Sequence, residues 1–157
     1  MAAFLHADER GGRFTGSNLG GWYCSFDLQT AITETIHHHT RRLSFSESGY
    51  HQTIQMRELC ARVDEQFDDI RGMKAAHPEL YHPDSYVDSQ RFGAERRDAG
   101  SNGICYDSVR LEGGVNLVIY RPRLVLDVMQ GDHFQYEWTG SAEPLISKLT
   151  NVAIAGA

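Results

Sequence analysis

Four polar residues recur at helical spacing in this sequence: Thr30, Glu34, His38 and Arg41. Because an α-helix turns by about 100° per residue, positions separated by three or four residues lie on one face. A carboxyl group, an imidazole and a guanidinium on one face can transfer a proton, stabilise a developing positive charge or bind an anion. The alternative is a solvated helix face with no chemical role, which such a pattern more often represents.

Two other kinds of chemistry fit the sequence less well. His37, His38 and His39 are adjacent, so they point to different faces of a helix and cannot converge on one ion. No histidine or cysteine spacing matches a zinc site, and we expect no metal. Ser108 with His38 and a carboxylate suggests a hydrolase triad, but the chain has no Gly-x-Ser-x-Gly motif.

The polar face must be positioned by a helix that we expect from about Leu28 to Leu43. A short aromatic strand, 22–25, precedes it, and Ser25 or Asp27 can cap its first turn. An apolar stripe, expected to face the core, lies roughly opposite the polar face: Leu28, Ile32, Ile36, His39 and Leu43. Upstream, the glycine-rich segment 8–21 contains Arg13, where a loop can bring a guanidinium close to a ligand.

The rest of the chain predicts a scaffold of short strands with one further helix. That helix runs from about Tyr86 to Arg97, capped by Asp84 or Ser85 and ended by Gly100. The expected strands are 2–6, 54–63, 67–70, 103–106, 115–120, 124–129 and 134–138. The segment 140–157 carries no clear pairing signal and is expected to be loosely held. We therefore predict one α+β domain with mixed or antiparallel sheets rather than βαβ winding.

Composition limits the class of protein. The chain has 157 residues, 41% hydrophobic and 23% charged, and a formal charge of -6. That charge argues against a broad nucleic-acid surface. Cys24, Cys60 and Cys105 are most simply three reduced thiols. No apolar run approaches a membrane span and no signal-peptide pattern begins the chain, so we expect a cytoplasmic protein.

Several short motifs occur together, in a fixed order, along most of the chain. They are Gly12-Arg13-Phe14, Trp22-Tyr23, the segment 30–35 with His38, the segment 103–110, Gly113-Gly114, the segment 134–138 and Gly140. In these motifs the sequence resembles the RES domain family, the toxins of bacterial toxin–antitoxin pairs, which is named after a shared arginine, glutamate and serine. The resemblance covers residues 1–140, which we take as the RES domain, with 141–157 as its C-terminal tail.

The resemblance implies a fold similar to the ADP-ribosyltransferases, NAD as substrate, and a helical, DNA-binding antitoxin as partner. From the charge and the lack of a long apolar run we expect no direct nucleic-acid or membrane binding. Arg13, Tyr23, Glu34 and Ser108 match the family residues. Chemistry supports these matches: a carboxylate at Glu34 can stabilise an oxocarbenium-like transition state, and Arg13 suits a diphosphate. Tyr23 offers the nicotinamide an aromatic face, and Ser108 offers a hydrogen bond.

Thr30 and His38 lie one turn on either side of Glu34. Thr30 would complete the NAD-binding face, and His38 would orient the carboxylate or carry a proton. The ADP-ribose acceptor stays open between water, phosphate and a protein. A strictly protein-directed mono-ADP-ribosyltransferase is the alternative within the enzyme class. A non-catalytic module that binds nucleotide or antitoxin is the alternative outside it.

Overall fold

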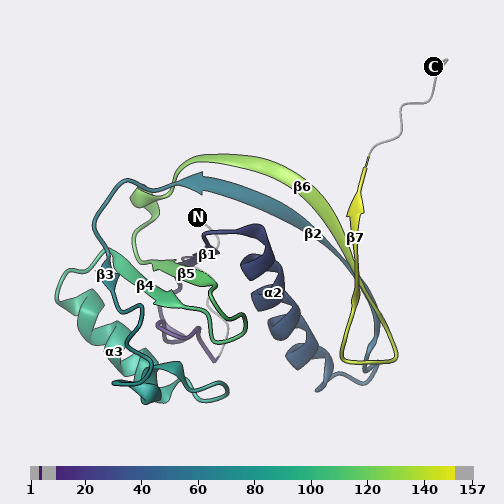
Figure 1. Ribbon diagram of the computed structural model, residues 1–157, viewed down its shortest axis with the longest axis horizontal. Helices are drawn as coiled ribbons and strands as arrows, with labels where there is room; N and C mark the ends of the chain where they lie inside the picture. Colours follow the sequence, from purple (N-terminus) through teal and green to yellow (C-terminus); the bar gives the residue numbers. More distant parts are fainter. Residues whose placement is uncertain (1–3, 5–9, 151–157) are drawn as a thin grey trace. The chain divides into compact units, whose positions relative to one another are not determined.

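A computed structural model describes Phe4 and residues 10–150 of the chain. The described residues form an α+β fold with one mixed and one antiparallel sheet, as the sequence predicts (Figure 1). They divide into two compact units: residues up to Glu34 together with 63–126, and residues 35–62 together with 127 onward. The predicted strand at 2–6 lies outside the described residues except Phe4, which is helical and buried.

The first unit is built on a four-stranded sheet in the order β1-β5-β4-β3. Its strands are β1 (Trp22–Ser25), β3 (Asp68–Asp69), β4 (Gly103–Asp107) and β5 (Val115–Ile119). β5 pairs antiparallel with both β1 and β4, whereas the short β3 runs parallel to β4. The strands predicted at 22–25, 67–70, 103–106 and 115–120 are thus confirmed.

The central strands β4 and β5 are buried on both faces, which explains why they are apolar along nearly their whole length. One face carries Ile104, Tyr106 and Val118, which pack with Phe14 in a single cluster. The other carries a second cluster made of Cys105, Leu117, Ile119 and Leu124. The central strands are therefore firmly held and can fix the side chains at their ends.

Helix α3 (Val87–Asp98) and the short 3₁₀ helix η1 (Pro78–Tyr81) also belong to this unit. The predicted side-chain cap of α3 by Asp84 or Ser85 is wrong, because Tyr86 is the N-cap and makes no side-chain cap bond. The amides of Asp84 and Ser85 instead donate to Nδ1 of His82, at 3.1 and 2.8 Å. Gly100 does end the helix, at a positive φ of 90° that favours glycine.

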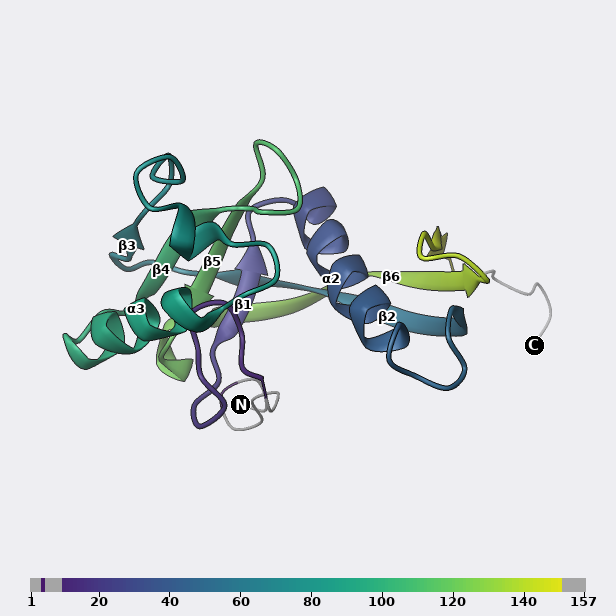
Figure 2. The same cartoon turned by 90° about the horizontal axis from the view of Figure 1, so that it is seen from below.

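Helix α2 (Leu28–Leu43) has the predicted limits and follows β1 directly (Figure 2). Its predicted cap is confirmed in Asp27, whose Oδ1 accepts the Thr30 amide at 2.8 Å. The apolar stripe is only partly right: Leu43 is buried, but Leu28 is 37% exposed. Thr30, which we placed on the polar face, is fully buried.

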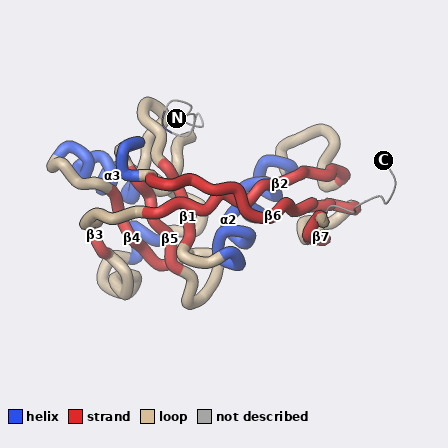
Figure 3. Tube along the Cα trace, turned by 90° about the horizontal axis from the view of Figure 1, so that it is seen from above, coloured by secondary structure: helices blue, strands red, loops and turns tan. Residues whose placement is uncertain are grey.

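The second unit contains the sheet β2-β6-β7, with strands β2 (His51–Arg62), β6 (Leu126–Thr139) and β7 (Leu145–Leu149). Figure 3 shows β2 and β6 side by side along most of their length. The C-terminal part of α2 belongs to this unit, where Thr40 Oγ1 accepts the indole N–H of the fully buried Trp138 at 3.1 Å.

Two predictions fail in this unit. Residues 124–129 and 134–138 were expected as separate strands, but β6 is continuous from Leu126 to Thr139, after the 3₁₀ turn η2 (Pro122–Leu124). Oε2 of Glu58 accepts the Asp132 amide at 3.0 Å, which supports the chain at the supposed break. The segment after 140 was expected to be loosely held, but β7 pairs antiparallel with β6 from Leu145 to Leu149.

Candidate functional site

Glu34 stands on α2 and receives two short hydrogen bonds on the same oxygen. The Ser108 hydroxyl and the Asn116 side-chain amide both donate to Oε1 at 2.7 Å. Among the described residues, the Glu34 side chain forms its hydrogen bonds through Oε1 and none through Oε2. The carboxyl group is therefore fixed through one oxygen while the other remains able to accept a bond from a ligand.

The loop between β4 and β5 determines the direction of the Ser108 hydroxyl. The amides of Arg110 and Leu111 both donate to Oγ of Ser108 at 3.0 Å, and the Ser108 amide donates to Gly114 O at 2.8 Å. Since both acceptor positions of the hydroxyl oxygen are occupied, its one proton points to Glu34. Two residues that the sequence assigned to one site are thus brought together.

Asn116 is a member of this cluster that the sequence analysis missed. It lies on β5, is 3% exposed, and accepts a 2.6 Å hydrogen bond from the Ser25 hydroxyl through Oδ1. That bond fixes the amide so that its N–H₂ group faces Glu34. The available signal was a single polar residue inside the apolar run 115–120, because a buried amide needs partners.

Thr30 lies at the start of α2 rather than on an open face. Its hydroxyl donates to Asp27 Oδ2 at 2.6 Å, and its side chain packs so closely on Gly114 that a Cβ there would overlap it. The contact joins the first turn of α2 to the loop that carries Ser108. The hydrogen bonds that Asp27 accepts hold the pKa of its carboxyl below the usual range. That Thr30 contacts NAD stays a prediction.

Arg13 is buried, 7% exposed, and holds η1 in place. Its Nη1 donates to the carbonyls of Leu80 and His82 at 3.2 and 2.9 Å, and its guanidinium lies 4.7 Å from the centre of the Tyr86 ring. Among the described residues only Nη1 of Arg13 makes these hydrogen bonds, so the N–H groups of Nε and Nη2 can donate to a ligand. Diphosphate binding by Arg13 stays a prediction.

Tyr23 supports the turn that carries Arg13. Its hydroxyl accepts the Phe14 amide at 3.0 Å and shares a 2.9 Å hydrogen bond with Thr15, and it lies so close to Gly12 that a Cβ there would overlap it. Burial of the hydroxyl end raises the pKa of Tyr23 to about 12, although the side chain as a whole is 39% exposed. The phenol is therefore neutral at ordinary pH, and the stacking of Tyr23 on nicotinamide stays a prediction.

Tyr106 connects these groups electrostatically. It is 5% exposed and packs edge-on against Phe14, with ring centres 4.8 Å apart. Burial raises its pKa well above the usual value, Tyr23 and Glu34 raise it further, and the positive charge of Arg13 lowers it. Arg13, Tyr23 and Glu34 therefore all act on one buried ring in the first unit.

His38 belongs to the second unit and is exposed on α2 one helical turn after Glu34. Its ring lies edge-on to that of His37, with centres 5.6 Å apart. The predicted role of His38 in orienting the carboxylate or carrying a proton stays a prediction. The three cysteines are free thiols. Among residues 4 and 10–150 there is no group of three or more side chains able to hold a metal ion.

The family model described as RES domain matches residues 1–139. A search of curated proteins finds no match for the sequence. Within the described residues, no helix combines the length and the apolar character needed to cross a membrane.

Proposed function

The chain belongs to the RES domain family, and on this premise we propose that it is the toxin of a toxin–antitoxin pair that cleaves the nicotinamide–ribose bond of NAD. ADP-ribose then passes to an acceptor. The observation that carries the proposal is the Glu34 carboxyl group, which holds Ser108 and Asn116 on one oxygen and leaves the other able to accept. A carboxyl group fixed in this way is organised before substrate arrives.

The proposed reaction is substitution at C1′ of the nicotinamide ribose. The bond from C1′ to the pyridine nitrogen breaks, and its electron pair neutralises the positive ring, which leaves as nicotinamide. Positive charge develops on C1′ and its ring oxygen, and the Glu34 carboxylate stabilises that charge. An acceptor oxygen then forms a bond to C1′ and loses its proton.

The other residues have supporting roles in this proposal. Ser108 and Asn116 orient Glu34 by their hydrogen bonds. Arg13 uses Nε and Nη2 to bind the diphosphate, since Nη1 is already bonded to Leu80 and His82. Tyr23, which is 39% exposed, stacks its ring on nicotinamide.

Thr30 joins the first turn of α2 to the β4–β5 loop through its bond to Asp27 and its contact with Gly114. That Thr30 also completes the NAD-binding face stays a prediction. That His38 orients the carboxylate or carries a proton stays a prediction. The partner is a helical, DNA-binding antitoxin, as is general for the toxins of this family. Co-expression with that antitoxin should restore growth to cells that the toxin arrests.

Mass spectrometry of the products tests the proposal. The purified chain is incubated with NAD, with and without inorganic phosphate, and compared with Glu34→Gln and with Glu65→Gln, an exposed loop carboxyl group of the same unit. We expect nicotinamide from the wild type and from Glu65→Gln, and none from Glu34→Gln. NAD binding without any product would instead support the non-catalytic module.

The second product identifies the acceptor. Free ADP-ribose indicates water, ADP-ribose 1″-phosphate indicates phosphate, and an adduct of increased mass indicates a protein. A cell lysate depleted of small molecules supplies candidate proteins for the third case. Growth arrest with unchanged cellular NAD, together with one modified protein, would support the protein-directed transferase over bulk NAD consumption.

A further inference from the structure

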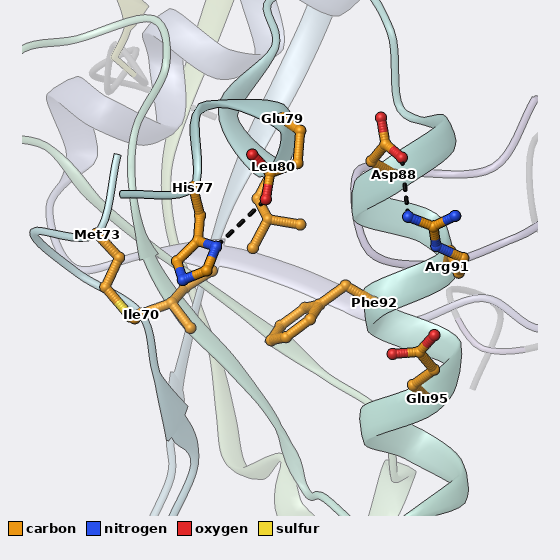
Figure 4. A pocket seen from close by; sticks show the side chains of 9 residues that line it. All are labelled: Ile70, Met73, His77, Glu79, Leu80, Asp88, Arg91, Phe92 and Glu95. Atoms are coloured by element: carbon orange, nitrogen blue, oxygen red, sulfur yellow. Dashed lines mark hydrogen bonds and ion pairs between the residues drawn. The ribbon is translucent and has the colours of Figure 1, made fainter. Parts of the chain in front are cut away.

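A pocket of about 450 Å³ lies in the first unit between α3 and the segment that leads into η1 (Figure 4). Its apolar lining comes from Ile70, Met73, Leu80 and Phe92, and Figure 4 shows the Phe92 ring reaching from α3 toward Ile70 and Leu80. The volume is in the range of about 300–1,000 Å³ typical of ligand sites. None of the residues assigned to NAD lines this pocket.

The charged lining of the pocket is predominantly acidic. Glu79, Asp88 and Glu95 provide three carboxyl groups against one guanidinium, Arg91, and one imidazole, His77. Two of the carboxyl groups already have partners. Asp88 accepts from Arg91 Nη2 at 3.1 Å, and Glu79 lies 3.2 Å from Nδ1 of His77.

Glu95 differs from the other two carboxyl groups. Within residues 10–150 its carboxyl oxygens form no hydrogen bond or ion pair, and it stands on the α3 wall one helical turn beyond Arg91. Phe92 lies between these two turns on the same wall of the pocket. An apolar surface beside a carboxyl group that has no partner suits a cation with an apolar stem.

We propose that this pocket binds an arginine side chain from a basic segment of a partner protein. The methylene stem lies on Phe92 and Leu80, and the guanidinium pairs with Glu95. Arginine fits better than lysine because its planar, weakly hydrated head stacks on an aromatic ring and forms paired bonds to a carboxylate. The formal charge of -6 on the chain attracts a basic segment that carries several positive charges. A single small cation is attracted less, and its binding depends mainly on the pocket itself.

Leu80 connects the pocket to Arg13, a residue of the candidate NAD site. The Leu80 side chain lines the pocket, while its carbonyl accepts the 3.2 Å hydrogen bond from Arg13. A bound side chain therefore touches the residue that helps to hold Arg13. The binding itself does not depend on the proposed enzymatic activity, and its test measures binding alone.

Amide NMR of the purified chain, titrated with the peptide acetyl-Leu-Arg-Leu-amide, tests the proposal. Saturable shifts should map to η1 and α3, including the Leu80 and Glu95 amides. The same peptide with citrulline in place of arginine keeps the shape but removes the charge. It should bind roughly tenfold more weakly, a difference of about 1.4 kcal/mol, because it loses the charge-assisted bonds to the carboxyl group.

A matched pair of variants locates the contact. Glu95→Gln should weaken arginine-peptide binding by about the same factor, whereas Glu65→Gln should not change it. Equal binding of the two peptides, shifts confined to other residues, or no saturable shift at all would overturn the proposal. Arginine amide binding as tightly as the peptide would indicate a small-molecule site and overturn the assignment to a partner segment.

Discussion

The Ser108 hydroxyl donates a 2.7 Å hydrogen bond to Oε1 of Glu34, although 74 positions separate the two residues in sequence. The serine is itself held by the amides of Arg110 and Leu111. The position of the candidate catalytic carboxyl group is therefore set by the β4–β5 loop as well as by its own helix. Variants that disturb this loop should change activity without touching Glu34.

Ser108→Ala should lower the rate of nicotinamide release. The variant removes one of the two hydrogen bonds to Glu34 and leaves the carboxyl group less well oriented. A misplacement of about 1 Å at a reacting centre costs about 10²-fold in rate. It also removes the acceptor for two loop amides, so the free energy of unfolding should fall by about 1–3 kcal/mol. Steady-state kinetics and chemical denaturation measure both effects; kinetics like the wild type's would show that the hydrogen bond does not matter for the reaction.

Asn116→Asp should be more harmful than its small change in shape suggests. It replaces the amide that donates to Glu34 by a second carboxyl group at 3% exposure, so two like charges share a buried site. Without the donor, the free energy of unfolding at neutral pH should fall by about 3–5 kcal/mol, and nicotinamide release should be lost. Asn18→Asp, on an exposed loop, is the control and should behave like the wild type.

Tyr23→Phe should change the pH dependence of stability above pH 10. Burial raises the pKa of Tyr23 from 10.0 to about 12, so between these values the folded chain keeps a proton that the unfolded chain loses. Stability contributed by this group is complete below pH 10 and is lost as the pH rises toward 12. The variant should therefore lose less stability across this window than the wild type.

The same variant should be less stable at neutral pH, by about 1–3 kcal/mol, because the Phe14 amide loses its acceptor. Tyr81, whose pKa burial also raises to about 12, is present in both proteins and cancels in the comparison. Thermal unfolding from pH 7 to pH 12 measures both effects. Parallel curves for the two proteins would show that folding does not change the pKa of Tyr23.

Gly93→Ala should destabilise the chain even though alanine favours helices. A Cβ at position 93 of α3 would overlap the backbone carbonyl of Phe14. Overpacking costs about 1–3 kcal/mol, which exceeds the roughly 1 kcal/mol that alanine gains over glycine in a helix. Ala94→Gly, on the exposed side of α3, is the reference and should cost only about 1 kcal/mol. A Gly93→Ala variant more stable than the wild type would contradict this packing.

The elements whose limits are set by neighbouring residues, such as α2, could be predicted from the sequence. The limits of α2 and its Asp27 cap follow from a cap residue placed before a periodic segment. The helix periodicity was less informative about burial. It placed Thr30 outside and Leu28 inside, because it could not include the hydroxyl bond to Asp27 and the contact with Gly114.

Long-range pairing accounts for the remaining errors. Residues 130–133 were expected to separate two strands, but Glu58 on the neighbouring strand accepts the Asp132 amide, so β6 continues. β7 has five exposed residues and no alternating apolar face, so only its pairing with β6 defines it. Asn116 has a role only because folding brings Ser25 to one side of it and Glu34 to the other.

The most direct test of the central proposal is nicotinamide release from NAD by the wild type, Glu34→Gln and Glu65→Gln. Glutamine keeps the shape of Glu34 but removes the charge that would stabilise the transition state. We predict release by the wild type and by Glu65→Gln, and no detectable release by a folded Glu34→Gln variant. Release by Glu34→Gln at the rate of the wild type would contradict the role assigned to Glu34.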